Sequence, residues 1–315
     1  MNYNATPDFK HNIAFIIPTR NRPELLTKLI RSIRNQTIKP DQVVIVDGSD
    51  NSIEPQIRRF LLPFFTFLRV IPPSLTKQRN AGVKALNEDI TLVGYLDDDI
   101  ILETDAVEAM LRFWEHSSDD VGGCSFNITN NPISSQFERS IKKFFYIDNG
   151  KDGSVLRSGY NTMVSPVLKD TYTKWLCGGA TVWRRSILEQ FKYDEWFSGW
   201  AYIEDVDFSF RVAQKYRLVV LLDARVQHNP PPFNSNKRYI LGKMDVMYRY
   251  HFINKHTYSS IPLFYFATIG LILITLAGGL VRRRLDGIKQ AAGYANGLFY
   301  VFRKKLIHTD MDFKK

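Results

Sequence analysis

The chain has 315 residues, of which 44% are hydrophobic and 23% charged, so it can build a substantial core and is not an intrinsically disordered protein. Its net charge of +10 indicates an anionic partner, which could be nucleic acid, a membrane face or a phosphorylated substrate. The sequence contains no zinc-finger spacing and no RNA-binding consensus, so we expect a membrane or phosphate partner and no nucleic acid. Two cysteines, Cys124 and Cys177, make a disulfide framework improbable and suit a reducing cytosol.

The N-terminal region alternates between predicted strands and helices. Residues 13–17 are continuously apolar, as in a buried strand, and residues 43–46 repeat this pattern. Between them, apolar residues at helical spacing predict a helix to about residue 36, with Asn21 as its N-cap. A short helix and a third strand are expected within residues 60–71, and a further helix is expected to begin after Ser74. This alternation predicts a doubly wound α/β domain with parallel strands.

Three consecutive carboxylates, Asp97, Asp98 and Asp99, end the apolar run of residues 90–96. In open α/β sheets, ligands bind at the carboxyl ends of the strands. Adjacent acids repel one another, and a hard divalent cation such as Mg²⁺ or Mn²⁺ would offset their charge and could hold phosphates. The alternative is an exposed acidic turn without a ligand.

Residues 129–173 show little periodicity, and a long irregular segment inside a compact domain is often a functional loop. The candidate site residues after this segment are Gly178, Gly179, Trp200, Glu204 and Asp205. The two acids begin a predicted helix, where the helix macrodipole alone would also favour them. A strand over residues 218–226 follows and ends near His228.

The C-terminal region differs from the rest of the chain. Residues 261–281 carry no charge and reach the length of a membrane-spanning helix, roughly 20 residues. Three arginines follow at residues 282–284 and would hold that end on the cytoplasmic side. Because both flanks are basic, an interfacial or re-entrant placement is about equally favoured, and a buried core helix is a further alternative. We therefore expect a catalytic domain over residues 1–236 and a helical, membrane-associating region over residues 237–315, with a basic amphipathic tail.

Five motifs together resemble family 2 glycosyltransferases with the GT-A fold. In chain order they are Ile16-Ile17-Pro18-Thr19-Arg20-Asn21-Arg22, Val44-Ile45-Val46-Asp47-Gly48-Ser49, Arg79-Asn80-Ala81-Gly82, Leu96-Asp97-Asp98-Asp99 and Glu204-Asp205-Val206-Asp207. Each motif is weak alone, but all five in this order are specific, and they cover roughly residues 13–228. The resemblance implies a Rossmann-like, mostly parallel sheet flanked by helices. It also implies transfer of a sugar, with inversion, from a nucleotide-diphosphate donor to an acceptor hydroxyl.

The resemblance also implies roles for individual residues. Asp205 is the expected catalytic base, since a carboxylate within hydrogen-bond reach can accept the hydroxyl proton. Asp99 and His228 are the expected ligands of Mg²⁺ or Mn²⁺. The expected donor-binding residues are Pro18, Thr19, Arg20, Asn21, Asp47, Ser49, Arg79, Asn80, Asp97 and Asp98. The expected acceptor-binding residues are Gly178, Gly179, Trp200 and Glu204.

A single sugar per acceptor is expected, because the Gln-x-x-Arg-Trp motif of processive relatives does not occur after Asp205. The transferred sugar would be a hexose or deoxyhexose. We expect the acceptor to be a hydroxyl of a glycan or lipid-linked glycan, used in cell-surface polysaccharide assembly at the cytoplasmic face of the cell membrane. Two alternatives are a polyprenyl-phosphate glycosyltransferase, whose ionised acceptor needs no base, and a non-catalytic nucleotide-sugar-binding membrane protein.

Overall fold

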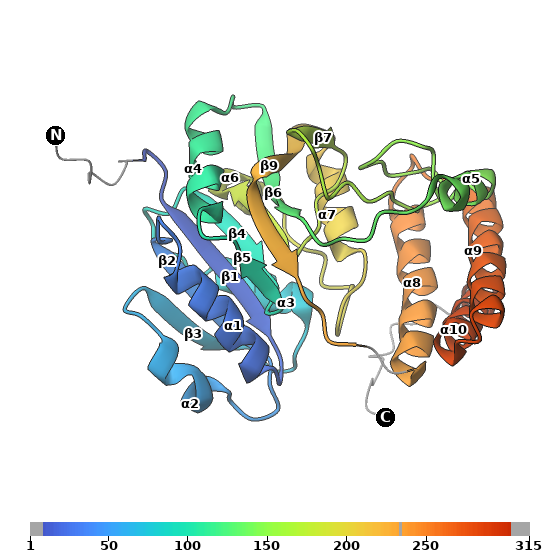
Figure 1. The fold of residues 1–315 in the computed structure, drawn as a ribbon, viewed down its shortest axis with the longest axis horizontal. Coiled ribbons are helices and arrows are strands. Elements are labelled where there is room, and N and C mark those ends of the chain that lie inside the picture. The colour runs from blue at the N-terminus through green and yellow to red at the C-terminus, as the bar shows by residue number, and fades with distance from the viewer. Residues whose placement is uncertain (1–8, 233–234, 304–315) are drawn as a thin grey trace. The chain divides into compact units, whose positions relative to one another are not determined.

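A mixed, mostly parallel sheet organises the chain (Figure 1). The computed structural model describes residues 9–232 and 235–303. The strands are β1 (Ile13–Thr19), β2 (Gln42–Asp47), β3 (Phe65–Arg69), β4 (Leu92–Leu96), β5 (Ile100–Leu102), β6 (Val121–Ile128), β7 (Thr171–Thr173), β8 (Ala180–Arg184) and β9 (Arg217–His228). Their order in the sheet is β3-β2-β1-β4-β8-β6-β9-β5, with β7 also paired to β9. Strands β5, β7 and β8 run antiparallel to their neighbours, and the other pairs are parallel.

Helices cover both faces of this sheet. The helices are α1 (Pro23–Arg34), α2 (Glu54–Ile57), the 3₁₀ helix η1 (Arg58–Phe60), α3 (Leu75–Val83), α4 (Ala106–His116), α5 (Gln136–Phe144), α6 (Arg185–Gln190), α7 (Glu204–Val212), α8 (Ser235–Lys255), α9 (Ile261–Val281) and α10 (Leu285–Phe302). Helices α1 and α4 contribute buried residues to the core on one face, and α6 and α7 contribute to the core on the other. This layering is the doubly wound arrangement that the sequence predicts.

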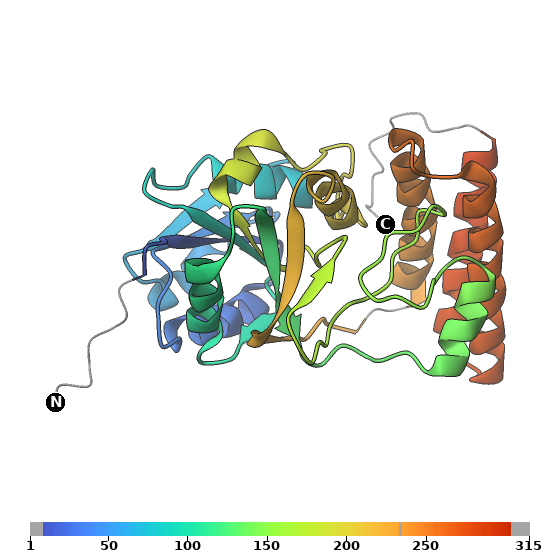
Figure 2. The same cartoon turned by 90° about the horizontal axis from the view of Figure 1, so that it is seen from above.

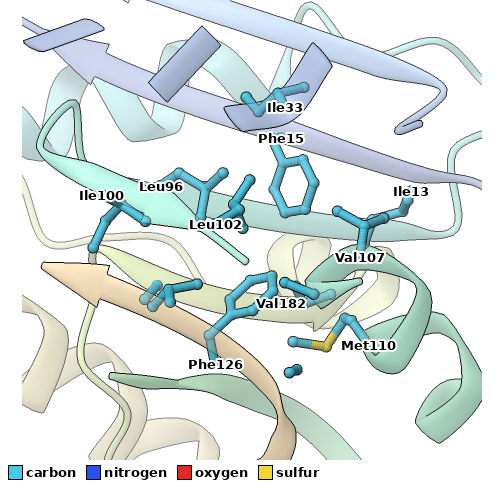
Figure 3. Packing of buried hydrophobic residues seen from close by; sticks show 14 of the residues in the cluster. Ile13, Phe15, Ile33, Leu96, Ile100, Leu102, Val107, Met110, Phe126 and Val182 are labelled. Atoms are coloured by element: carbon cyan, nitrogen blue, oxygen red, sulfur yellow. The ribbon is translucent and has the colours of Figure 1, made fainter. Parts of the chain in front are cut away.

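Strand β1 shows why its residues are continuously apolar. Phe15 and Ile17 belong to the core beneath α1 and α4, whereas Ala14 and Ile16 belong to the core on the opposite face. In the first core the Phe15 ring lies near that of Phe126, with centroids 6.2 Å apart (Figure 3). Since successive strand residues point to opposite faces, a strand covered on both sides loses the apolar–polar alternation.

Most predicted elements are confirmed with small shifts at their ends, but one cap was wrong. The N-cap of α1 is Arg22, not Asn21. Asn21 has a φ of +55°, and its backbone N–H donates to Ser49 Oγ at 2.7 Å. The chain therefore makes a left-handed turn after β1 before the helix begins, a conformation that asparagine tolerates well. The helix expected within residues 60–71 lies earlier, as α2 and η1. The segment expected to be irregular, residues 129–173, contains α5 and β7.

By their internal contacts the residues form two compact units. One comprises Met1–Asn131 with Val164–Pro230 and contains the sheet; the other comprises Pro132–Met163 with Pro231–Lys315 and contains α5, α8, α9 and α10. The expected division after residue 236 stays a prediction about independent domains. The basic amphipathic tail was expected over residues 285–315. Its first part forms α10, and residues 304–315 lie outside the described residues.

Within the second unit, α10 packs along both α8 and α9 (Figure 2). The α8–α10 approach is so close that a Cβ at Gly293 would lie 2.1 Å from the Tyr239 carbonyl oxygen. Among the described helices, α9 is the one long and apolar enough to cross a membrane. However, 28% of its most apolar stretch is buried inside the protein. Its relation to a membrane stays a prediction.

Candidate active site

The carboxyl ends of β1 and β4 bring two predicted donor-binding residues into direct contact. Thr19 is the last residue of β1, and its Oγ1 donates to Asp98 Oδ2 at 2.7 Å. Gln78 on α3 donates from Nε2 to the carbonyls of Thr19 at 3.0 Å and Val46 at 2.6 Å, which ties the ends of β1 and β2 together. This polar edge is where an open α/β sheet binds its ligand.

Arg22 supplies the positive charge that the aspartate run requires. Its Nη1 lies 3.0 Å from Asp98 Oδ1 and 3.7 Å from Asp99 Oδ2. Burial nevertheless raises the pKa of Asp98 to about 6, against the lowering effects of Arg22 and Thr19. Arg22 stands in the first motif, but sequence reasoning gave it no role. The three adjacent aspartates predict a neighbouring positive charge, but the sequence does not indicate that Arg22 supplies it.

A second arginine connects Asp97 to the acids of α7. Arg79 is 1% exposed, and its Nη1 donates to Glu204 Oε1 at 2.7 Å while Nη2 donates to Asp97 Oδ1 at 3.4 Å. The guanidinium also lies over the Tyr193 ring, 4.9 Å from the centroid. Burial opposes its charge, but the acidic groups around it raise the pKa of Arg79 above its ordinary value. Two predicted donor residues and one predicted acceptor residue thus form one network, in which Arg79 and Glu204 are buried and the Asp97 side chain is 37% exposed.

Gly178 and Gly179 lie between Asp97 and Asp205. Asp205 Oδ2 accepts the Gly178 backbone N–H at 2.9 Å, and the Asp97 N–H donates to the Gly179 carbonyl at 2.9 Å. A Cβ at Gly179 would lie 2.2 Å from Asp97 Oδ2, and one at Gly178 would lie 2.8 Å from the Asp205 Cβ. The glycines therefore allow two acids of the chain itself to approach one backbone segment. Contact of these glycines with an acceptor stays a prediction.

The loop before Glu204 is held in an unfavourable backbone conformation. Ala201 and Ile203 have φ values of 45° and 58°, which L residues other than glycine rarely adopt. Helix α3 anchors this loop, because the Leu75 N–H donates to the Gly199 carbonyl at 3.0 Å and Thr76 Oγ1 donates to a carbonyl two residues earlier. Trp200, a predicted acceptor contact, is 39% exposed on this anchored loop.

Asp99 and His228 meet because β5 pairs with β9 in a register that places Ile100 opposite His228. His228 Nε2 lies 3.2 Å from Asp99 Oδ1, a buried atom that makes no hydrogen bond of good geometry. A carboxylate and an imidazole suit Mn²⁺-type ions, and such cations often complete their coordination with phosphate oxygens and water. Within the described residues, no cluster of three or more His, Cys, Asp or Glu side chains could hold a metal ion. Asp99 and His228 could therefore supply two of the ligands of such a cation.

Asp47 and Ser49 are fully buried at the end of β2. Asp47 accepts backbone N–H groups from Ser49 at 2.8 Å and Ile53 at 3.2 Å. Both carboxylate oxygens are therefore already engaged, and their role in donor binding stays a prediction.

Four further predicted donor residues are engaged within the protein. Pro18 lies inside β1, opposite Val46 of β2. Arg20 and Asn21 both bind the side chain of Asp50, at 3.1 and 3.0 Å. Asn80 exchanges hydrogen bonds with the Tyr193 backbone, at 3.0 and 3.1 Å. Direct contacts of these residues with a donor also stay predictions.

Comparisons with known proteins found a matching sequence family and several similar proteins. The sequence model of the family described as "Glycosyl transferase family 2" matches residues 14–190. An uncharacterized glycosyltransferase of Bacillus subtilis (strain 168), YwdF, is 25% identical over 270 residues, which cover 82% of this chain and 88% of YwdF. The S. aureus TarS 1–349 structure has 16% identity and a TM-score of 0.47, covering 93% of this chain and 92% of that one.

The mannosyltransferase PcManGT from Pyrobaculum calidifontis, solved with GDP-Man and Mn²⁺, has 15% identity and a TM-score of 0.58, covering 97% of this chain and 91% of that one. The likeness to PcManGT and the family match confirm the predicted GT-A type of fold. The family model covers more than half of the sequence, so the chain belongs to glycosyltransferase family 2.

Proposed function

We propose that this glycosyltransferase is a metal-dependent, inverting enzyme that moves one hexose or deoxyhexose from a nucleotide-diphosphate sugar to an acceptor hydroxyl. The observation that carries the proposal is the Arg79 network. It joins Asp97, on the strand edge expected to bind the donor, to Glu204, beside the expected base Asp205. Donor and acceptor groups would therefore meet in one place.

A divalent cation would be held by Asp99 and His228. PcManGT was solved with GDP-Man and Mn²⁺, which supports a cation of this kind here. When bound, it would neutralise the charge that develops on the departing nucleoside diphosphate. Arg22 beside Asp98 and Asp99 adds a fixed positive charge at the same edge.

Asp205 is positioned to act as the base. Its side chain is partly exposed, and its two oxygens are oriented by the N–H groups of Gly178 and Val206 at 2.9 and 2.8 Å. In the proposed single displacement, the acceptor oxygen bonds to the anomeric carbon as the bond to the donor phosphate breaks. The hydroxyl proton passes to Asp205, and the electron pair leaves with the nucleoside diphosphate.

The loss of activity on acidification should begin at a higher pH than it would with an ordinary aspartate as the base. Burial raises the pKa of Glu204 to about 7, with the charge of Asp205 adding to the effect, and burial also raises the pKa of Asp205. A base acts only when ionised, so a raised pKa moves the loss of activity on acidification towards neutral pH. We expect kcat/KM to fall on acidification with an apparent pKa above about 3.9, the value of an ordinary aspartate, measured from initial rates in the presence of excess metal. An apparent pKa at or below that value would contradict the assignment.

The acceptor is proposed to be a hydroxyl of a glycan or lipid-linked glycan at the cytoplasmic face of the cell membrane. The excess of positive charge and the apolar helix α9 support a membrane location. The partly exposed Asp205 supports a hydroxyl, since an ionised phosphate acceptor would need no base.

A donor screen tests the function directly. The purified full chain is incubated with single nucleotide sugars and Mn²⁺ or Mg²⁺, and release of the nucleoside diphosphate is measured with and without simple glycan acceptors. We expect turnover with at least one donor, more than a tenfold loss on chelation by EDTA, and recovery when the cation is added back. Nucleotide binding without turnover under every condition would instead indicate a non-catalytic binding protein.

A further inference from the structure

The net charge of the chain resides in its C-terminal quarter. Residues 237–315 hold fourteen Lys and Arg, four Asp and no Glu, which gives +10 and equals the net charge of the whole chain. The remaining residues are therefore balanced. A basic segment of this kind attracts an anionic surface.

One face of α9 is both apolar and exposed. The residues of this face, named here the α9 stripe, are Phe266, Ile269, Leu273 and Leu280. They recur at helical spacing and are 40%, 48%, 52% and 59% exposed, in that order. The other side of the helix packs inside its unit, where Ala267 and Thr268 are fully buried and Thr268 bonds Tyr160 at 3.0 Å. The stripe is therefore exposed to solvent, and the opposite side of α9 already packs against its own unit.

Aromatic side chains extend the stripe beyond α9. Phe144 and Tyr146 are 68% and 51% exposed, and their rings lie 6.2 and 6.3 Å from the ring of Phe266. Exposed apolar patches of this kind mark interaction surfaces, and aromatic residues are favoured at the membrane–water interface. Nucleic acid would match the charge but would leave this patch exposed to water.

The packing of the unit decides between lying on a membrane and crossing it. Helix α10 packs along α9, and α10 is in turn attached to the start of α8, where Lys289 Nζ bonds Ser235 Oγ at 3.0 Å. Helix α8 carries the buried pair Arg249 and Asp245, whose atoms are 2.6 Å apart. If α9 crossed a bilayer, α8 with its charged pair would enter the hydrocarbon together with it, which charged side chains resist.

We propose that the α9 stripe docks the second unit onto an anionic bilayer, with α9 lying parallel to the membrane plane. The stripe and the Phe144–Tyr146 rings face the acyl chains, and Arg282, Arg283 and Arg284 lie among the lipid phosphates. All three arginines are exposed, and none pairs with an acid among the described residues. The proposal defines how the chain meets the membrane and does not depend on its transfer activity.

Co-sedimentation with vesicles tests the surface. We expect the full chain to bind vesicles containing about 30% phosphatidylglycerol better than pure phosphatidylcholine, and less as salt increases. Phe266→Ser with Leu273→Ser should lower the partition coefficient by at least about tenfold. The control is Leu168→Ser with Ile71→Ser, which alters residues 93% and 62% exposed in the other unit and should leave vesicle binding unchanged.

Replacing Arg282, Arg283 and Arg284 by Gln should weaken binding to anionic vesicles by more than about tenfold. The control for this change is Arg58→Gln with Arg59→Gln.

Labelling separates docking from crossing. Cysteines introduced as Ile261→Cys and Val281→Cys mark the two ends of α9, and Cys124 and Cys177 of the unchanged chain set the background. On vesicles bound from outside, a membrane-impermeant maleimide should reach both ends. Protection of one end would show a spanning helix and overturn the proposal.

Other outcomes also overturn it. These are binding that ignores the stripe variants, binding to RNA in place of vesicles, or a dimer that the stripe variants dissociate. Circular dichroism and nucleotide binding of each variant confirm that it is folded. Donor turnover without vesicles is measured separately, so failure to bind lipid leaves the proposed function intact.

Discussion

Replacing Asp205 by asparagine is expected to lower kcat by about 10²- to 10⁴-fold while nucleotide-diphosphate affinity stays within about twofold. The change keeps the shape of the side chain, and the remaining carbonyl oxygen can still accept the Gly178 N–H. The change removes the capacity to take the acceptor proton, and it also removes the acceptor of the Val206 N–H. Steady-state kinetics together with calorimetric nucleotide binding measure the two quantities separately.

Asp207 provides the matched control on the same helix. It is fully buried and pairs with Arg211 at 3.0 Å. Asp207→Asn should therefore lower the thermal midpoint and leave kcat nearly unchanged. If Asp205→Asn kept more than about a tenth of the activity, or if both variants lost activity equally, Asp205 would not be the base.

Replacing Arg79 by methionine is expected to lower the free energy of unfolding by about 3–5 kcal/mol, because it leaves the buried carboxylate of Glu204 without its positive partner. Arg79 is 1% exposed and pairs with Glu204 at 2.7 Å, so water cannot take its place. Urea denaturation followed by tryptophan fluorescence measures the loss.

Two further variants make this test specific. Arg58→Met alters an arginine of η1 that is 77% exposed and pairs with Glu54 of the preceding α2, so its effect should stay below about 1 kcal/mol. Combining Arg79→Met with Glu204→Gln should cost less than the two single changes together, because the stranded carboxylate is gone. Strict additivity would show that Arg79 and Glu204 are not coupled.

The α/β frame could be predicted because burial on both faces leaves a direct mark on the sequence. The continuously apolar residues 13–17 became β1, and the acids after residue 96 lie at a strand end as expected. The conformation of Asn21 could not be predicted, because its left-handed turn is set by contact with Ser49, which lies on the next strand–loop segment.

The pairing of charged residues in the candidate site could also not be predicted from the sequence. Arg22 lies 76 residues from Asp98, and Arg79 lies 125 residues from Glu204. The local sequence indicates that these acids need positively charged partners. Which arginine pairs with which acid is determined by the tertiary fold. Asn80 illustrates the same limit: its neighbours in the motif gave no sign that the Tyr193 backbone, 113 residues away, would occupy its amide.

Helix α3 has nine residues, yet it is hydrogen-bonded on both the expected donor side and the expected acceptor side. Gln78 donates to the carbonyl at the end of β2, and Arg79 donates to the Glu204 carboxylate. Thr76 donates to a carbonyl of the loop that carries Trp200. A helix this short is rigid. A displacement of α3 on the donor side should therefore also displace the residues that it binds on the acceptor side. Occupancy of the nucleotide side should therefore alter affinity on the alcohol side, and the kinetics should show a compulsory order of substrate addition.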